Sequence, residues 1–137
     1  MTLYYRLRTL STAIAVAGIL FAAVRMYQHR VYMLNERNSI MVMEGITMDE
    51  LEKTKFLKSY CEERKSSYLQ RGIVEAATDF DKQIDYYAKR AGKLASKVRV
   101  YRQWRSQIEY TISHPWLATP PEPQIPETEP GYGAFID

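Results

Sequence analysis

The side chains best suited to chemistry are few and far apart along this chain of 137 residues. The histidines are His29 and His114, and the one cysteine, Cys61, lies at no spacing from either that suits a metal site or a nucleophile with its base. The glycines form no phosphate-binding loop. We therefore expect no catalytic or metal-binding residue, no cofactor and no enzymatic activity. A lone cysteine cannot form an internal disulfide, so we interpret Cys61 as a small apolar residue beside an interface.

A run of basic residues is the second candidate for chemistry, because no acidic residue occurs between Asp85 and Glu109. Clustered lysine and arginine side chains can bind nucleic-acid phosphates or anionic lipid. No nucleic-acid recognition motif accompanies them and the formal net charge is only +3, which disfavours nucleic acid. Contact with protein or anionic lipid is favoured, and a merely solvated surface is the simpler alternative. We call this set the basic face: Lys89, Arg90, Lys93, Lys97, Arg99 and Arg102.

Charge and proline divide the chain into three segments. Residues 1–45 contain no acidic side chain before Glu36, whereas residues 46–113 hold most charges of both signs. Residues 114–137 contain all six prolines and no lysine or arginine. Three compositions in so short a chain indicate three environments: a membrane anchor with a juxtamembrane helix, a helical body, and an extended acidic tail.

The most apolar part of the chain lies between Arg8 and Arg25, where 16 consecutive residues carry no charge. As a helix this stretch is about 24 Å long, slightly short of a hydrocarbon core of about 30 Å. The flanking arginines can extend their aliphatic stems along the core and keep their charges at its edge. Tyr4, Tyr5 and Tyr27 lie where interfacial aromatic residues are enriched.

Three interpretations of this stretch compete: a permanent anchor, a cleaved secretory signal, and a mitochondrial targeting segment. We favour the anchor, and an uncleaved anchor is compatible with a mitochondrial address because one basic, acid-free stretch can serve both. Arginines lie on both sides of the stretch, so the charge distribution does not set its orientation.

Small residues recur along one side of this predicted membrane helix at spacings of four, three and four. Such stripes let helix backbones approach closely inside lipid. The simpler alternative is that alanine and glycine are common in membrane helices. We predict that a neighbouring transmembrane helix docks on this face, which comprises Ser11, Ala15, Gly18 and Ala22.

The first helix of the body is predicted over residues 47–70. Gly45 precedes it, Thr47 and Glu50 have the spacing of a capping box, and Gly72 provides a stop. Its apolar residues are irregularly spaced: Leu51, Phe56, Leu57, Tyr60, Cys61, Tyr68 and Leu69.

The following segment has the most regular pattern in the chain. Twelve positions from Ile73 to Ile112 alternate spacings of four and three, and only Arg105 among them is neither apolar nor aromatic. More than five heptads of this kind indicate a helix of coiled-coil type. The interface predicted from this pattern comprises Ile84, Tyr87, Ala91, Leu94, Val98, Tyr101, Ile108 and Ile112.

This interface must be covered, and a helix over residues 47–70 can fold back across Gly72 to cover only part of it. We expect the remainder, residues 95–112, to pack on another polypeptide. Self-association as a parallel coiled coil is the alternative, but Tyr87, Tyr101 and Arg105 are poor choices for a homodimer seam.

The tail begins where His114-Pro115 ends the helix. Its prolines predict an extended, irregular chain, but it also holds apolar side chains that purely disordered tails lack. We predict that these side chains anchor it on a partner surface: Trp116, Ile125, Tyr132 and Phe135.

The expected fold is thus all-α, with a single N-terminal transmembrane helix, an extended helical hairpin or coiled-coil body, and an irregular proline-rich tail. This layout is similar to accessory subunits of respiratory complexes or an ATP synthase stalk. We expect a structural subunit of a mitochondrial inner-membrane complex whose partners are other subunits and the bilayer. The alternatives are a membrane-anchored assembly factor or tether acting through the coiled coil, and an adaptor binding nucleic acid through residues 89–105.

Overall fold

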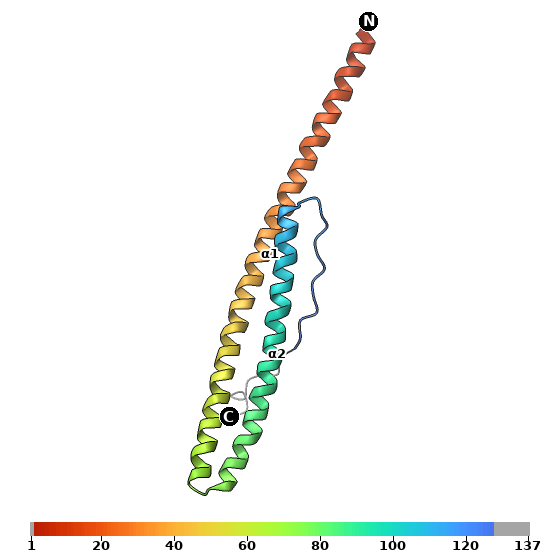
Figure 1. The fold of residues 1–137 in the computed structure, drawn as a ribbon. Coiled ribbons are helices and arrows are strands. Elements are labelled where there is room, and N and C mark those ends of the chain that lie inside the picture. The colour runs from red at the N-terminus through yellow and green to blue at the C-terminus, as the bar shows by residue number, and fades with distance from the viewer. Residues whose placement is uncertain (1, 128–137) are drawn as a thin grey trace, which may run out of the picture. The chain divides into compact units, whose positions relative to one another are not determined.

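The structure is a computed structural model that describes the backbone of residues 2–127 and the side chains from residue 8 onward. Over this range it contains two helices, α1 (Thr2–Gln70) and α2 (Val74–Ser113), and no strand (Figure 1). The prediction of an all-helical protein is confirmed for these residues. Residues 128–137 lie outside the described part of the chain, and with them the predicted tail anchors Tyr132 and Phe135.

The turn between the helices is fixed by Gly72, whose φ is 75°. The Gly72 N–H donates to the Leu69 carbonyl at 3.0 Å, and the Ile73 N–H donates to the Tyr68 carbonyl at 3.1 Å. This is the Schellman pattern, which needs a left-handed residue after the helix and costs any residue other than glycine roughly 1–2 kcal/mol. The predicted stop at Gly72 is confirmed.

The second helix ends at Ser113, before the predicted break at His114-Pro115. The His114 N–H still donates to the Tyr110 carbonyl at 3.1 Å, and the Leu117 N–H donates to the His114 carbonyl at 2.9 Å. A short turn thus follows α2, and residues 118–127 have no regular secondary structure.

The described residues form two compact units, which we treat separately. The first unit comprises residues 2–38 and 106–121, and the second comprises residues 39–105 and 122–127.

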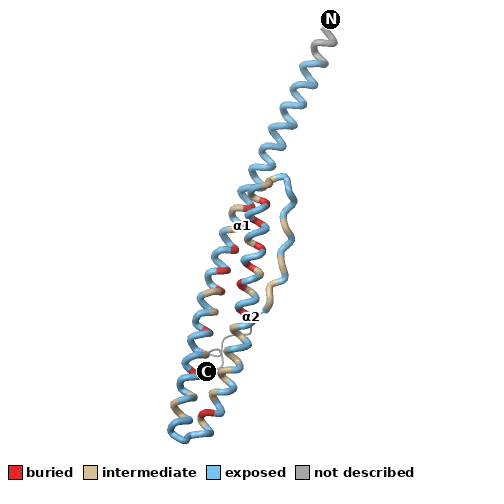
Figure 2. Tube along the Cα trace, viewed as in Figure 1, coloured by how far each residue is buried: buried red, intermediate tan, exposed pale blue. Residues whose placement is uncertain are grey.

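Within the second unit, α1 and α2 run antiparallel away from the Gly72 turn. Successive contacts mark their register: Tyr68 stacks on Phe80 with ring centroids 5.6 Å apart, and the Cys61 thiol donates to Gln83 Oε1 at 3.4 Å. Further from the turn, Glu44 pairs with Arg102 and Arg105. Buried positions are spread along both helices (Figure 2), and the buried apolar residues of this unit are Ile40, Cys61, Ala77, Leu94, Val98, Tyr101 and Trp104.

The predicted helix start at Gly45–Thr47 is wrong, because α1 continues through it without a break. The Thr47 hydroxyl donates to the Met43 carbonyl at 2.7 Å, four residues earlier, instead of capping a new helix. A glycine inside a helix costs only about 1 kcal/mol. The burial of Ile40 before Gly45 and the ion pairs of Glu44 with α2 offset that cost.

The residues that α1 turns toward α2 also differ from the apolar set predicted for residues 47–70. Phe56 is 70% exposed, whereas Thr54 is only 4% exposed. The inward positions recur every seven residues, and we call them the α1 seam: Met33, Ile40, Thr47, Thr54, Cys61 and Tyr68. Threonine can be buried here because Thr54, like Thr47, donates its hydroxyl to a backbone carbonyl four residues earlier.

The chain itself covers part of residues 95–112, and the expected contact of this segment with another polypeptide stays a prediction. Leu94 is fully buried and Tyr101 is 2% exposed inside the second unit, and Ile108 is fully buried inside the first unit. The sequence placed the start of the covering helix at Thr47. The continuous α1 adds buried residues before that point, Met33 and Ile40 among them.

The first unit contains the apolar stretch, in which residues 8–28 are exposed throughout (Figure 2). Helix α1 is long and apolar enough here to cross a membrane, and no residue of its most apolar part is buried. Met33 and Ile108 are the fully buried side chains of this unit among the residues described.

The burial of Cys61 and Tyr101 predicts how the stability of the fold depends on pH. Burial raises the pKa of its thiol, and burial likewise raises the pKa of Tyr101. Each group with a raised pKa in the folded state contributes to the free energy of unfolding. This contribution is fully present below the ordinary pKa of the group and is lost as the pH rises through its pKa in the folded protein. The free energy of unfolding should therefore fall in the alkaline range, above about pH 9.

The same burial should make alkylation of Cys61 by iodoacetamide near pH 8 at least roughly tenfold slower in the folded protein than in the unfolded chain. The rates are measured in detergent micelles and in denaturant. Equal rates would place Cys61 outside the helix pair.

Candidate functional site

The predicted transmembrane docking face lies on the membrane-competent part of α1. Its members Ser11, Ala15, Gly18 and Ala22 are all exposed, and a side-chain carbon added at Gly18 would meet nothing within 4 Å. The Ser11 hydroxyl donates to the Arg8 carbonyl at 2.9 Å, which satisfies it inside the helix. The face is therefore open to a neighbouring helix, and its docking role stays a prediction.

The predicted heptad interface is the side of α2 that the chain itself covers. Leu94, Val98, Tyr101 and Ile108 are buried, while Ile84, Tyr87, Ala91 and Ile112 are half-buried. Trp104 is also buried, one position before the heptad residue Arg105. Sequence reasoning missed it because the strict spacing of three and four passes over it.

Arg105 departs from the apolar heptad pattern because it pairs with a buried carboxylate. Glu44, whose side chain is 7% exposed, accepts hydrogen bonds from Arg102 Nε at 2.9 Å and Arg105 Nη1 at 2.6 Å, one on each carboxylate oxygen. A buried carboxylate needs such partners, since an unpaired charge in this setting is costly. The result is a charged bridge between α1 and α2 inside the second unit.

The basic face does not form one surface. Its six residues occupy five different heptad positions on α2, so they are distributed around every side except the interface. Arg102 is engaged by Glu44, and Lys89 pairs with Asp85 at 2.7 Å. Around Tyr86, a hollow of about 240 Å³ is lined by Lys89, Arg90 and Lys93.

The described tail anchors differ in burial. Trp116 is 69% exposed, whereas Ile125 is half-buried. Trp116 lies in the first unit, in the short turn that follows α2.

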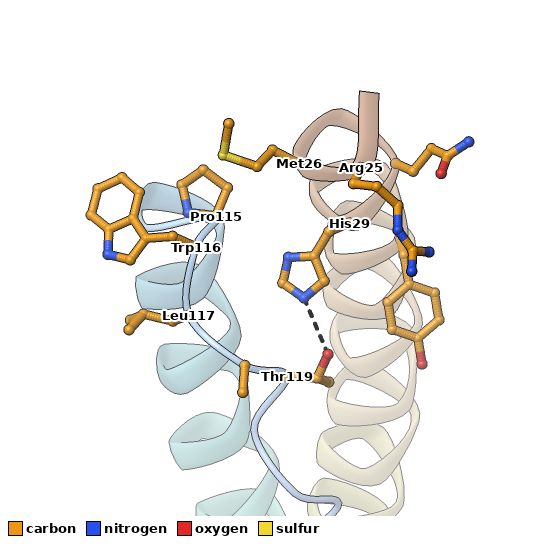
Figure 3. A pocket seen from close by; sticks show the side chains of 10 residues that line it. Arg25, Met26, His29, Pro115, Trp116, Leu117 and Thr119 are labelled. Carbon is orange, nitrogen blue, oxygen red and sulfur yellow. Dashed lines mark hydrogen bonds between the residues drawn. The ribbon is translucent and has the colours of Figure 1, made fainter. Parts of the chain in front are cut away.

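A pocket in the first unit opens between this turn and α1, and we call it the boundary pocket (Figure 3). Its volume is about 640 Å³, within the range of small-molecule sites. Its α1 side begins at Arg25, the first charged residue after the apolar stretch, and its other side is the segment 115–119. The lining residues are Arg25, Met26, Gln28, His29, Tyr32, Pro115, Trp116, Leu117, Ala118 and Thr119.

The His29 side chain extends from α1 toward the segment 115–119 on the other side of the boundary pocket (Figure 3). Its Nε2 lies 3.2 Å from the Thr119 hydroxyl. Its Nδ1 is buried and has no hydrogen-bond partner among the residues described. If the Thr119 hydroxyl donates to Nε2, the ring proton is on Nδ1, where it has no acceptor among the described residues.

A second exposed feature, absent from the sequence predictions, runs along α1 in the second unit. We call it the outer apolar stripe: Val42, Met43, Ile46, Phe56, Leu57 and Tyr60, all at least 41% exposed. The first three and the last three have the same spacing and lie 14 residues apart, so two heptads bring both groups to one side of the helix. Asp49 and Lys53, paired at 2.6 Å, lie between the groups.

The outer apolar stripe explains why the apolar residues of 47–70 looked irregular. Two patterns are superposed there, and the more hydrophobic one faces outward. The inward pattern could have been found from the seven-residue spacing of the α1 seam, which does not depend on hydrophobicity.

Comparison with known proteins found no match among protein-family models, curated proteins or solved structures. Groups of three or more histidine, cysteine, aspartate or glutamate side chains able to hold a metal ion are absent from the described residues.

Proposed function

We propose that this protein is a non-catalytic structural subunit of a multi-protein membrane complex, anchored by α1 as a single transmembrane helix. The observation that carries the proposal is the outer apolar stripe. Single exposed apolar residues are ordinary, but two groups of three on one side of a helix are typical of a contact surface. The chain covers much of its heptad interface, whereas no stripe residue is buried among the residues that the structure describes, so the stripe can contact another protein.

Two further features support a role in holding subunits together. The membrane-competent part of α1 offers its face of small residues to a neighbouring helix. Trp116 and the other apolar residues of the tail suit an extended contact along a partner. We propose a mitochondrial inner-membrane complex, because the first 35 residues contain arginines and no acidic residue. A respiratory or ATP synthase assembly is proposed from the similarity of layout alone.

The test is to replace two members of the outer apolar stripe, Ile46→Glu with Phe56→Glu, and to isolate the protein from native membranes in mild detergent. The matched control is Ser59→Glu with Ser66→Glu, which adds the same charge at exposed positions on another side of α1. On native gels followed by mass spectrometry, we expect the wild type and the control in a large band of fixed composition. The stripe variant should be lost from that band.

Retention of the stripe variant at the wild-type ratio would contradict the proposed contact. A wild-type chain found only in small bands of variable composition would instead indicate an assembly factor or tether, which meets its client transiently.

A further inference from the structure

We propose that the boundary pocket binds the phosphate group of an anionic phospholipid. The inference rests on the part of the proposed function in which α1 crosses the membrane, because that crossing sets the depth of the pocket. Arg25 directly follows the apolar stretch, so the pocket begins where hydrocarbon gives way to headgroups.

The charge around the boundary pocket suits an anion. Arg25 lines it, and the sequence contains no acidic residue in 1–35 or in 110–121, the two segments from which the lining comes. Within these two segments an anion meets the Arg25 guanidinium, which lies 5.9 Å from the centre of the Phe21 ring, and no carboxylate. Guanidinium groups bind phosphate through charge-assisted hydrogen bonds.

One hydrogen-bonding atom of the pocket, Nδ1 of His29, lacks an acceptor of the kind that a phosphate oxygen supplies. Nδ1 of His29 is buried in the pocket wall without a hydrogen-bond partner among the described residues. Buried polar groups in proteins are almost always satisfied, and a bound ligand is one way to satisfy them. Nδ1 is covered in this structure, so a phosphate oxygen can accept from it only after the pocket wall opens locally, while Thr119 holds Nε2.

The apolar and aromatic groups of the pocket favour a lipid over a soluble phosphate. Trp116 and Tyr32 are amphipathic rings of the kind found at headgroup level, and both are more than half exposed. Met26 and Pro115 lie at the rim (Figure 3), where a glycerol backbone and the first acyl carbons would pass. A soluble phosphate would leave these groups without contact.

Trp116 provides the readout, because it is exposed whereas Trp104 is buried in the second unit. The full chain is reconstituted into phosphatidylcholine bilayers that contain a minor fraction of brominated phosphatidylglycerol or, separately, of brominated phosphatidylcholine. We expect bound brominated phosphatidylglycerol to quench the fluorescence with roughly fivefold higher apparent affinity, as one or two charge-assisted hydrogen bonds would give. Trp116→Phe should remove the quenched signal.

The variant Arg25→Gln should abolish the preference for the anionic lipid. Its matched control Arg30→Gln removes the same charge from an exposed position of α1 that does not line the pocket, and it should keep the preference. Equal quenching by both lipids in the wild type, or equal loss in both variants, would overturn the site. Competition by soluble glycerol phosphate at the same strength as by lipid would also overturn the choice of a lipid ligand.

Failure of the site and failure of the anchor are distinguished by vesicle flotation of the same samples. A chain that floats with the vesicles and withstands carbonate extraction but shows no lipid preference refutes only the phosphate site. A chain that does not stay with the vesicles refutes the membrane crossing, and with it both proposals.

Discussion

Replacing Leu94 by aspartate is expected to lower the free energy of unfolding of the protein by roughly 3–5 kcal/mol. The Leu94 side chain is fully buried in the second unit, where α1 covers it. An aspartate there loses the apolar contacts of leucine and places a carboxylate where no cation is available from the α1 seam. Denaturant unfolding in detergent micelles, followed by circular dichroism, measures the change.

The matched control is Ala95→Asp, which adds the same charge at the next residue of α2, an exposed position. It should cost less than about 1 kcal/mol, which is what helix propensity alone predicts. This comparison also shows whether α1 or another polypeptide buries the heptad interface. If the interface were covered only by another polypeptide, both variants of the purified chain would have similar stability.

The second large effect concerns the charged bridge between Glu44, Arg102 and Arg105. Replacing both arginines by methionine should destabilise the protein by roughly 2–4 kcal/mol, because the buried Glu44 carboxylate is left without a partner. We expect the lower part of this range to apply if water reaches the carboxylate through the space of Arg102, whose side chain is 56% exposed. Denaturant unfolding again provides the measurement.

Adding Glu44→Met to the two arginine replacements should restore most of the lost stability. The triple variant has no charge in the bridge, and buried ion pairs can be exchanged for apolar residues of similar size with little loss. A triple variant that is no more stable than the double variant would contradict this expectation and would show that the bridge itself is a net source of stability.

The sequence predicted the α2 side of the fold better than the α1 side. On α2 the heptad positions are apolar, so periodicity and hydrophobicity agree, and residues such as Leu94 and Ile108 are buried where the pattern places them. The Gly72 turn was also predictable, because a left-handed helix end is a local requirement. In these features no second physical preference favours a different structure.

The two criteria conflict on α1. The seam there uses Thr47, Thr54 and Cys61, whereas Phe56 and Ile46 face outward. A prediction based on hydrophobicity therefore chooses the outer side. Gly45 and the Thr47–Glu50 spacing also imitate a helix start, and only the packing of the flanking residues keeps the helix continuous.

The boundary pocket could not be predicted, because its two sides come from residues about 90 positions apart, as His29 and Thr119 illustrate. No local pattern in either segment indicates that they meet. The sequence indicated Arg25 as a flanking residue of the apolar stretch and Trp116 as a tail anchor, but their common location depends on the register between α1 and the end of α2.

The polar character of the α1 seam has a consequence for the order in which the chain can fold. Ribosomes deliver α1 before α2, and the residues of α1 that await their partner include Thr47, Thr54 and Glu44, which tolerate water in the interval. Pairing can then start at Tyr68 and Phe80, which flank the turn, and close toward Glu44 one contact after another. Each step brings together segments already held near each other, so the search is short and the second unit should fold quickly once α2 has emerged.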